Sequence, residues 1–117
     1  MSSLTNPIEH PAFTTGSTAI DHNLYVHQGK LYESNYRSGL HVFDTATPAA
    51  PVRIAWFDTW PEDEGANFNS LWNNYPFLPS GTILGSDIEK GLFVWRLGPA
   101  EIDFAFPAGP PSVVSPE

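Results

Sequence analysis

Apolar and polar residues alternate along the chain in short runs that turn residues separate. In the first half, the runs rich in aromatic and β-branched residues are 23–27, 30–36, 40–45 and 52–58. Glycine, proline and small polar residues lie between them, which is typical of strands joined by turns. No stretch combines a helical period of apolar residues with the capping signals of a helix. The pattern therefore predicts an all-β chain.

The same pattern occurs twice, at a distance of 52 positions. Residues 19–44 align without a gap to residues 71–96, and the octet RSGLHVFD meets EKGLFVWR. Gly39 coincides with Gly91, and we expect both in tight turns, where glycine supplies a positive φ without steric cost. A match of this length predicts two copies of one structural unit.

Three proline-led segments mark the ends of units. PVRIAWF at 51–57, PAEIDFAF at 99–106 and PIEHPAF at 7–13 resemble one another. Proline is tolerated at the first residue of a strand or on an edge, so we interpret all three as outer strands. The expected organisation is a leftover outer strand with its lead-in (1–16), unit one (17–58), an acidic loop (59–70), unit two (71–106) and a Pro-rich tail (107–117).

The strand sequences LHVFD and LFVWRL carry apolar groups on both faces, as sheets covered on both sides do. Antiparallel four-stranded sheets that pack face to face with their neighbours form a β-propeller, with blades of about 40–50 residues. We therefore predict a β-propeller fragment of about two four-stranded blades plus a leftover outer strand. Val42 and Val94 should then both be buried between blades. A β-sandwich is the alternative, but it does not explain a gap-free repeat.

Composition narrows the classes of partner. Thirteen acidic residues against five basic ones give a formal net charge of −8, which argues against nucleic acid or an anionic membrane as partner. No apolar run approaches the ~20 residues of a membrane helix, and the start of the chain does not read as a signal peptide. Without cysteine, the chain has neither disulfides nor thiolate chemistry. Because two blades do not close a ring of ~4–8, the expected partners are further blades or other copies of the chain.

Several stretches resemble a known family. AIDHNLYV, NYRSGL, FDTWPE, YPFLPSG and SDIEKGLFV, within residues 6–98, are similar to the C-terminal part of the choice-of-anchor B proteins, which are built from LVIVD-type repeats. The resemblance implies a secreted or surface-attached bacterial β-propeller with no established catalytic activity. The chain departs from the family because it shows no N-terminal blades, export signal or C-terminal anchor. It is therefore expected to correspond to the last two blades of a longer protein.

The cluster Asp21, His22 and Asn23 precedes the first strand, and Asn73 and Asn74 occupy matching positions in unit two. At the mouth of a propeller channel, such carboxylate, imidazole and amide groups are suited to hold a divalent cation or a small polar ligand. The alternative, which we favour, is that they cap the loop by bonding to its backbone.

Glu62, Asp63 and Glu64 form a second polar cluster. Their oxygens suit a divalent cation such as calcium, but the alternate-residue spacing of a calcium loop is missing. A solvated acidic loop is the interpretation that we favour.

The tryptophans at 56, 60, 72 and 95 offer surfaces on which sugars or peptides stack, but their place in a repeat favours core packing, most clearly for Trp95 and Phe43. Motifs for a serine nucleophile, a zinc protease or a phosphate loop are missing. We therefore expect a non-catalytic interaction module that binds an unknown protein or small polar ligand. The alternative is a metal-dependent binder or hydrolase-like enzyme, with a site in the channel that missing blades complete.

Overall fold

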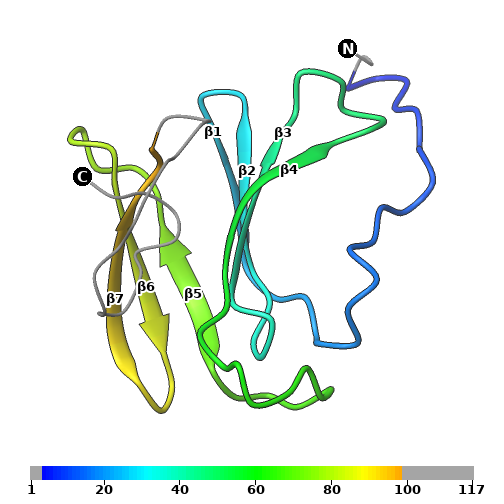
Figure 1. The fold of residues 1–117 in the computed structure, drawn as a ribbon. Helices are drawn as coiled ribbons and strands as arrows, with labels where there is room; N and C mark the ends of the chain where they lie inside the picture. Colours follow the sequence, from blue (N-terminus) through cyan, green and yellow to red (C-terminus); the bar gives the residue numbers. More distant parts are fainter. Residues whose placement is uncertain (1–3, 99–117) are drawn as a thin grey trace.

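The computed structural model describes residues 4–98, which form seven strands and no helix. The first sheet contains β1 (Leu24–His27), β2 (Lys30–Ser34), β3 (Leu40–Asp44) and β4 (Val52–Phe57). The second sheet contains β5 (Leu71–Tyr75), β6 (Thr82–Asp87) and β7 (Gly91–Arg96) (Figure 1). Strands that are neighbours in sequence pair antiparallel throughout. The prediction of an all-β chain is confirmed, and within residues 4–98 nothing forms a helix long and apolar enough to cross a membrane.

The central hairpins of the two sheets have the same register. Leu31 of β2 lies opposite Phe43 of β3, and their counterparts 52 positions later, Ile83 and Trp95, lie opposite each other in β6 and β7. The turn before β3 and the start of β7 both use a glycine of positive φ, 77° and 84°. The repeat in the sequence is therefore a repeat of hairpin structure.

The first strands of the two sheets are not equivalent. β1 joins β2 through a two-residue turn, whereas β5 ends at Tyr75 and six residues lead to β6. That connection contains Pro76 and Pro79, which lack the N–H that a longer strand would need. β5 also has an irregular register between Leu71 and Asn73. As a result, the gap-free alignment places β5 on residues 19–23 and not on β1.

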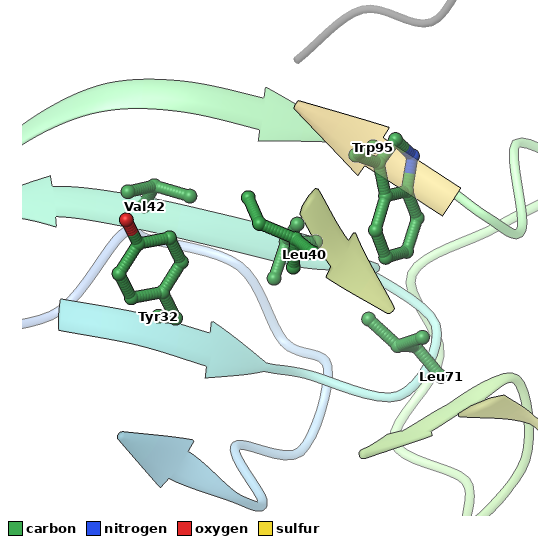
Figure 2. Packing of buried hydrophobic residues seen from close by; sticks show 6 residues of the cluster. Tyr32, Leu40, Val42, Leu71 and Trp95 are labelled. Atoms are coloured by element: carbon green, nitrogen blue, oxygen red, sulfur yellow. The ribbon is translucent and has the colours of Figure 1, made fainter. Parts of the chain in front are cut away.

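The two sheets pack through unlike faces of their central hairpins. Face A is defined in the first sheet by Tyr32, Ser34, Leu40 and Val42, and in the second by their counterparts Leu84, Ser86, Leu92 and Val94. Face B is the opposite side, with Leu31, Glu33, His41 and Phe43 in the first sheet and Ile83, Gly85, Phe93 and Trp95 in the second. Face A of the first sheet meets face B of the second in a cluster that contains Tyr32, Leu40, Val42, Leu71, Ile83 and Trp95 (Figure 2).

Gly85 allows the Trp95 ring to lie against the backbone of β6. A Cβ at position 85 would lie 2.3 Å from a carbon of that ring, closer than atoms approach in proteins. Phe57 of β4 packs against two aromatic rings of β7. Its ring centroid lies 5.7 Å from that of Phe93 and 5.6 Å from that of Trp95. Large aromatic rings dominate the apolar area that such an interface buries, so Trp95 anchors the contact between the sheets.

The expectation that both repeat valines are buried is correct for Val42 and wrong for Val94. Val42 is fully buried, whereas Val94 is 55% exposed. The reason is geometric, since Val94 lies on face A of the second sheet, the side that points away from the first sheet. The sequence repeat determines on which face of its sheet a side chain lies. It does not determine whether another part of the molecule covers that face.

The outer strand expected at residues 7–13 is not formed. This segment runs along the side of the first sheet that faces away from the second sheet (Figure 1). The Phe13 ring meets Phe43 there edge-on, at 5.1 Å. A strand needs a neighbour to pair with, and Pro7 and Pro11 each remove a backbone donor. The expected fourth strand of unit two at 99–106 and the tail at 107–117 lie outside the described residues.

Candidate functional site

His22 and Asn23 of the first polar cluster contact β5, the strand that carries Asn73 and Asn74, at the junction of the two sheets. His22 Nδ1 lies 2.7 Å from the carbonyl oxygen of Trp72, and Asn23 Nδ2 donates to the same oxygen at 3.4 Å. Because a carbonyl only accepts, His22 carries its proton on Nδ1 in this bond. The His22 ring packs 4.8 Å from the rings of both Tyr36 and Trp72. These contacts use a backbone carbonyl, but it belongs to β5 of the second sheet and not to the loop that contains the cluster.

Asp21 completes this cluster as an exposed carboxylate near β2. Burial raises the pKa of Glu33, the nearby Asp21 carboxylate raises it further, and a hydrogen bond from Asn35 opposes both effects. This edge of the junction is therefore rich in hydrogen-bond acceptors and negative charge. In the part of the chain that the structure describes, no group of three or more His, Asp or Glu side chains is placed to hold a metal ion. A metal-binding role for Asp21 and His22 stays a prediction.

Asn74 links the two sheets. Its side chain is 2% exposed, and its Nδ2 donates to Ser34 Oγ at 2.7 Å and to the Tyr32 carbonyl at 3.4 Å. The Oδ1 atoms of Asn73 and Asn74 are buried and accept no hydrogen bond from any described group. Buried acceptors of this kind are uncommon in folded proteins. Asn73 lies opposite Ser86 and therefore on face A, where a donor from a partner would be favourable, whereas Asn74 faces the first sheet.

A hollow of about 110 Å³ opens beside these amides, on face A of the second sheet. Leu92 is 69% exposed at its margin and Tyr75 is 50% exposed. The lining residues carry no charge: Asn73, Asn74, Tyr75, Leu84, Gly85, Ser86 and Leu92. The arrangement combines apolar side chains with a few amide groups, as sites that bind partner side chains do.

A buried serine–histidine pair was missed by the sequence analysis. Ser38 Oγ lies 2.8 Å from His41 Nε2, a distance that also joins a nucleophile to its base. Arg53 Nη1 lies 3.4 Å from His41 Nδ1, and since arginine only donates, Nδ1 accepts and Nε2 carries the proton. His41 therefore donates toward the Ser38 hydroxyl and its carbonyl, at 3.1 Å, and cannot take the hydroxyl proton.

The surroundings of this pair also indicate a structural role. Both residues are 1% exposed, and Trp56 Nε1 donates to the Ser38 carbonyl at 2.7 Å. Burial and the Arg53 charge lower the pKa of His41 to about 4, although the hydrogen bond to the Ser38 carbonyl acts in the opposite direction. The signal in the sequence was a histidine between two apolar strand residues, at the position where unit two has Phe93.

The acidic loop is held between the equivalent turns of the two sheets. Arg37 Nη1 lies 2.5 Å from Asp63 Oδ1, and Lys90 Nζ lies 3.5 Å from Glu62. Trp60 has the Arg37 guanidinium 5.3 Å and the Lys90 ammonium 4.8 Å from its ring centroid. The pKa of Asp63 is lowered, mainly by the hydrogen bond from the backbone N–H of Gly65 and to a smaller extent by the hydrogen bond from Arg37.

The third acid, Glu64, accepts a bond from Thr18 through its backbone carbonyl, at 2.7 Å. Glu62, Asp63 and Glu64 are exposed, as a solvated loop requires, but the interpretation overlooked the ion pairs that fasten it. Binding of a cation to these residues stays a prediction.

A second buried hydroxyl network fixes the turn after β6. Ser70 Oγ lies 2.7 Å from Thr59 Oγ1 and donates to Asp87 Oδ2 at 2.9 Å. The other oxygen of Asp87 accepts from the backbone N–H groups of Glu89 and Lys90. These groups bond to one another and to the backbone of the turn. The network therefore holds the hairpin in place and offers no activated nucleophile.

The tryptophans divide between core and surface. Trp95 is 3% exposed and, with the buried Phe43, confirms the expected core role. Trp72 and Trp56 are 45% and 37% exposed, so core packing describes them only in part. Comparisons of the chain with protein-family models, with curated proteins and with solved structures found no match.

Proposed function

We propose that this protein is a non-catalytic interaction module that binds a partner through face A of its second sheet. The observation that carries the proposal is the uncharged hollow at Leu92 and Tyr75, together with the buried Oδ1 atom of Asn73 on the same face, which accepts no hydrogen bond from a described group. Exposed apolar surface on a small protein marks a site of interaction. The pairs that resemble catalytic groups are engaged in internal hydrogen bonds, which supports a binding role over a reaction.

In its wider setting, we propose that the chain forms two blades of an LVIVD-repeat β-propeller of the choice-of-anchor B kind. The identical register of the two central hairpins and the packing of face A on face B support stacked, equivalent blades. A secreted or cell-surface location is part of the same proposal and depends on the sequence resemblance alone.

The alternative is a metal-dependent binder or hydrolase-like enzyme centred on the junction. It draws on the carboxylates of Glu33 and Asp21, because burial and then the charge of Asp21 raise the pKa of Glu33. A divalent cation at this place would need further ligands from other blades or copies.

Nuclear magnetic resonance titrations of the ¹⁵N-labelled full chain distinguish these functions. With phenol as the probe, we expect amide shifts at residues that line the hollow, because an aromatic ring fits an apolar depression. Leu92→Glu should abolish the shifts by placing a charge there, whereas Val52→Glu, at an equally open strand position, should keep them.

Calcium, manganese and zinc ions are titrated separately. Shifts at Asp21 and His22 that disappear in His22→Ala would support the alternative function. Phenol shifts that are absent, or the same in Leu92→Glu, would contradict the proposed one.

A further inference from the structure

Face A of the second sheet is an open apolar surface. Leu92 is 69% exposed, Val94 55% and Tyr75, which lies opposite Leu84 of this face, 50%. The side chains that define face A include no carboxylate, in a chain with thirteen acidic and five basic residues. This surface therefore lacks the negative charge that keeps copies of the rest of the molecule apart.

The chain itself shows what covers such a surface. In the first sheet, the equivalent residues Leu40 and Val42 are fully buried under face B of the second sheet. Because the two hairpins share one register, face A of the second sheet presents side chains in the same places. Its natural complement is thus face B of another unit of the same repeat.

We propose that a second copy of this chain supplies that unit, docking face B of its first sheet onto face A of the second sheet. This inference rests on the proposed function, since it uses the same binding face, and it adds the partner and the direction of docking. Each copy then offers one face A and one face B, so the contact is head to tail and continues from copy to copy.

Face B of the first sheet is available in part. Leu24 and Val26 of β1 lie on this side and are 51% and 63% exposed. Phe43, the counterpart of the anchor Trp95, lies under Phe13, which is itself 49% exposed and belongs to a segment without strand pairing. Docking therefore replaces the Phe13 contact, and Leu24 and Val26 lie open on the same face.

The contact between copies should be weaker than the contact within one chain. On face B of the first sheet, Glu33 and His41 replace the Gly85 and Phe93 of the second. These polar side chains fit an apolar surface less well. We therefore expect reversible association that depends on protein concentration.

Sedimentation velocity of the full chain over a wide range of concentration tests the proposal. The unmodified chain should form dimers and larger species. Leu92→Glu on face A and Val26→Glu on face B should each lose this association, with a dissociation constant raised about tenfold or more. Val52→Glu, on neither docking face and 62% exposed, should associate like the unmodified chain.

Mixing the two blocked variants tests the direction of docking. Leu92→Glu keeps its face B and Val26→Glu keeps its face A, so an equimolar mixture should form a 1:1 dimer and nothing larger. Phe13→Ala should strengthen association several-fold, because it uncovers Phe43. Circular dichroism of each variant shows that it remains folded.

Three outcomes would overturn the proposal. A chain that stays monomeric at every concentration has another occupant on face A, either its own residues 99–117 or a different protein. Homodimers of Val26→Glu would indicate contact between two copies of face A. Unchanged association of Leu92→Glu would place the contact elsewhere. In the first case, phenol shifts at the hollow would still support the proposed function, so the two failures are separable.

Discussion

The two sheets share a hairpin register but not an environment. The first sheet lies between the second sheet and residues 7–13, so Leu40, His41, Val42 and Phe43 are all buried (Figure 1). Among residues 4–98, the second sheet packs on the first through face B, and Leu92 and Val94 on its face A are exposed. The comparison teaches that local sequence determines strand pairing, whereas the number of neighbours determines burial.

The side chains at matched positions reflect this difference. Face B of the second sheet has Gly85 and Trp95, a flat surface that fits against a sheet. Face B of the first sheet has Glu33 and Phe43 at these places and is covered by irregular chain. Within one chain, therefore, only face B of the second sheet packs against another sheet.

The strongest test of the comparison is to truncate the same leucine in each unit. Leu40→Ala should lower the free energy of unfolding by about 2–5 kcal/mol, because it opens a cavity in a closed core. Leu92→Ala should change it by less than about 0.5 kcal/mol, as at other exposed sites. Urea unfolding followed by tryptophan fluorescence measures both, at a concentration where the chain is monomeric. Equal losses would show that face A of the second sheet is covered within the monomer.

The second test concerns the histidine that unit one has in place of a phenylalanine. Burial and Arg53 lower the pKa of His41 from 6.5 to about 4, so the unfolded chain binds the proton more readily. The stability it contributes is present above pH 6.5 and is lost as the pH falls toward 4. With about 1.4 kcal/mol for each pKa unit, the loss approaches about 3 kcal/mol.

Urea unfolding between pH 7.5 and about 4 checks this sign. Glu33 partly offsets the loss, because its raised pKa makes the folded state bind a proton more readily at low pH. His41→Phe, which copies Phe93, removes the titrating group and should flatten the acid side of the curve. An unchanged pH dependence in that variant would assign the acid sensitivity to other groups.

Sequence reasoning succeeded where the information is local. The turn glycines, the strands of the first sheet and the equivalence of Leu31 with Ile83 all follow from short patterns of apolar and turn residues. It failed where the answer depends on a distant neighbour. Nothing near Val94 shows that its face is exposed, and nothing near residues 7–13 shows that they pair with no strand of the described part of the chain.

In the candidate site, too, sequence reasoning found the features that depend on local pattern and missed those that depend on packing between strands. The sequence predicted that residues 21–23 share a rim with Asn73 and Asn74, but it did not predict the contact of His22 and Asn23 with the Trp72 carbonyl. The hollow at Leu92 and the Ser38–His41 pair were not anticipated, since both arise from packing between strands. Register alone would have placed His41 opposite Glu33 and suggested a polar patch on face B.

A third test compares the two turn glycines. Gly39 and Gly91 both have positive φ, so alanine at either position should cost about 1–2 kcal/mol from backbone strain. At Gly39 a Cβ would also lie 2.1 Å from the Phe57 carbonyl oxygen, whereas at Gly91 it meets open space. Gly39→Ala should therefore cost at least about 1 kcal/mol more, as overpacking does. Thermal and urea unfolding compare the two, and equal costs would mean that the first turn relaxes without strain.

The smallest expected effect concerns the loop that joins the two equivalent turns. Lys90 comes from the second sheet, contacts Glu62 at 3.5 Å and lies over Trp60, while Arg37 serves the same loop from the first sheet. Lys90→Met keeps most of the side-chain volume and removes the charge, so we expect a loss of about 0.5 kcal/mol. Salt should shrink the difference from the unmodified chain, because it screens exposed charges. Hydrogen exchange should be faster at amides of residues 62–69, with Lys30→Met, on β2, as the matched control. If hydrogen exchange at residues 62–69 is equally fast in both variants, Lys90 does not hold the loop, and Arg37 of the first sheet holds it alone.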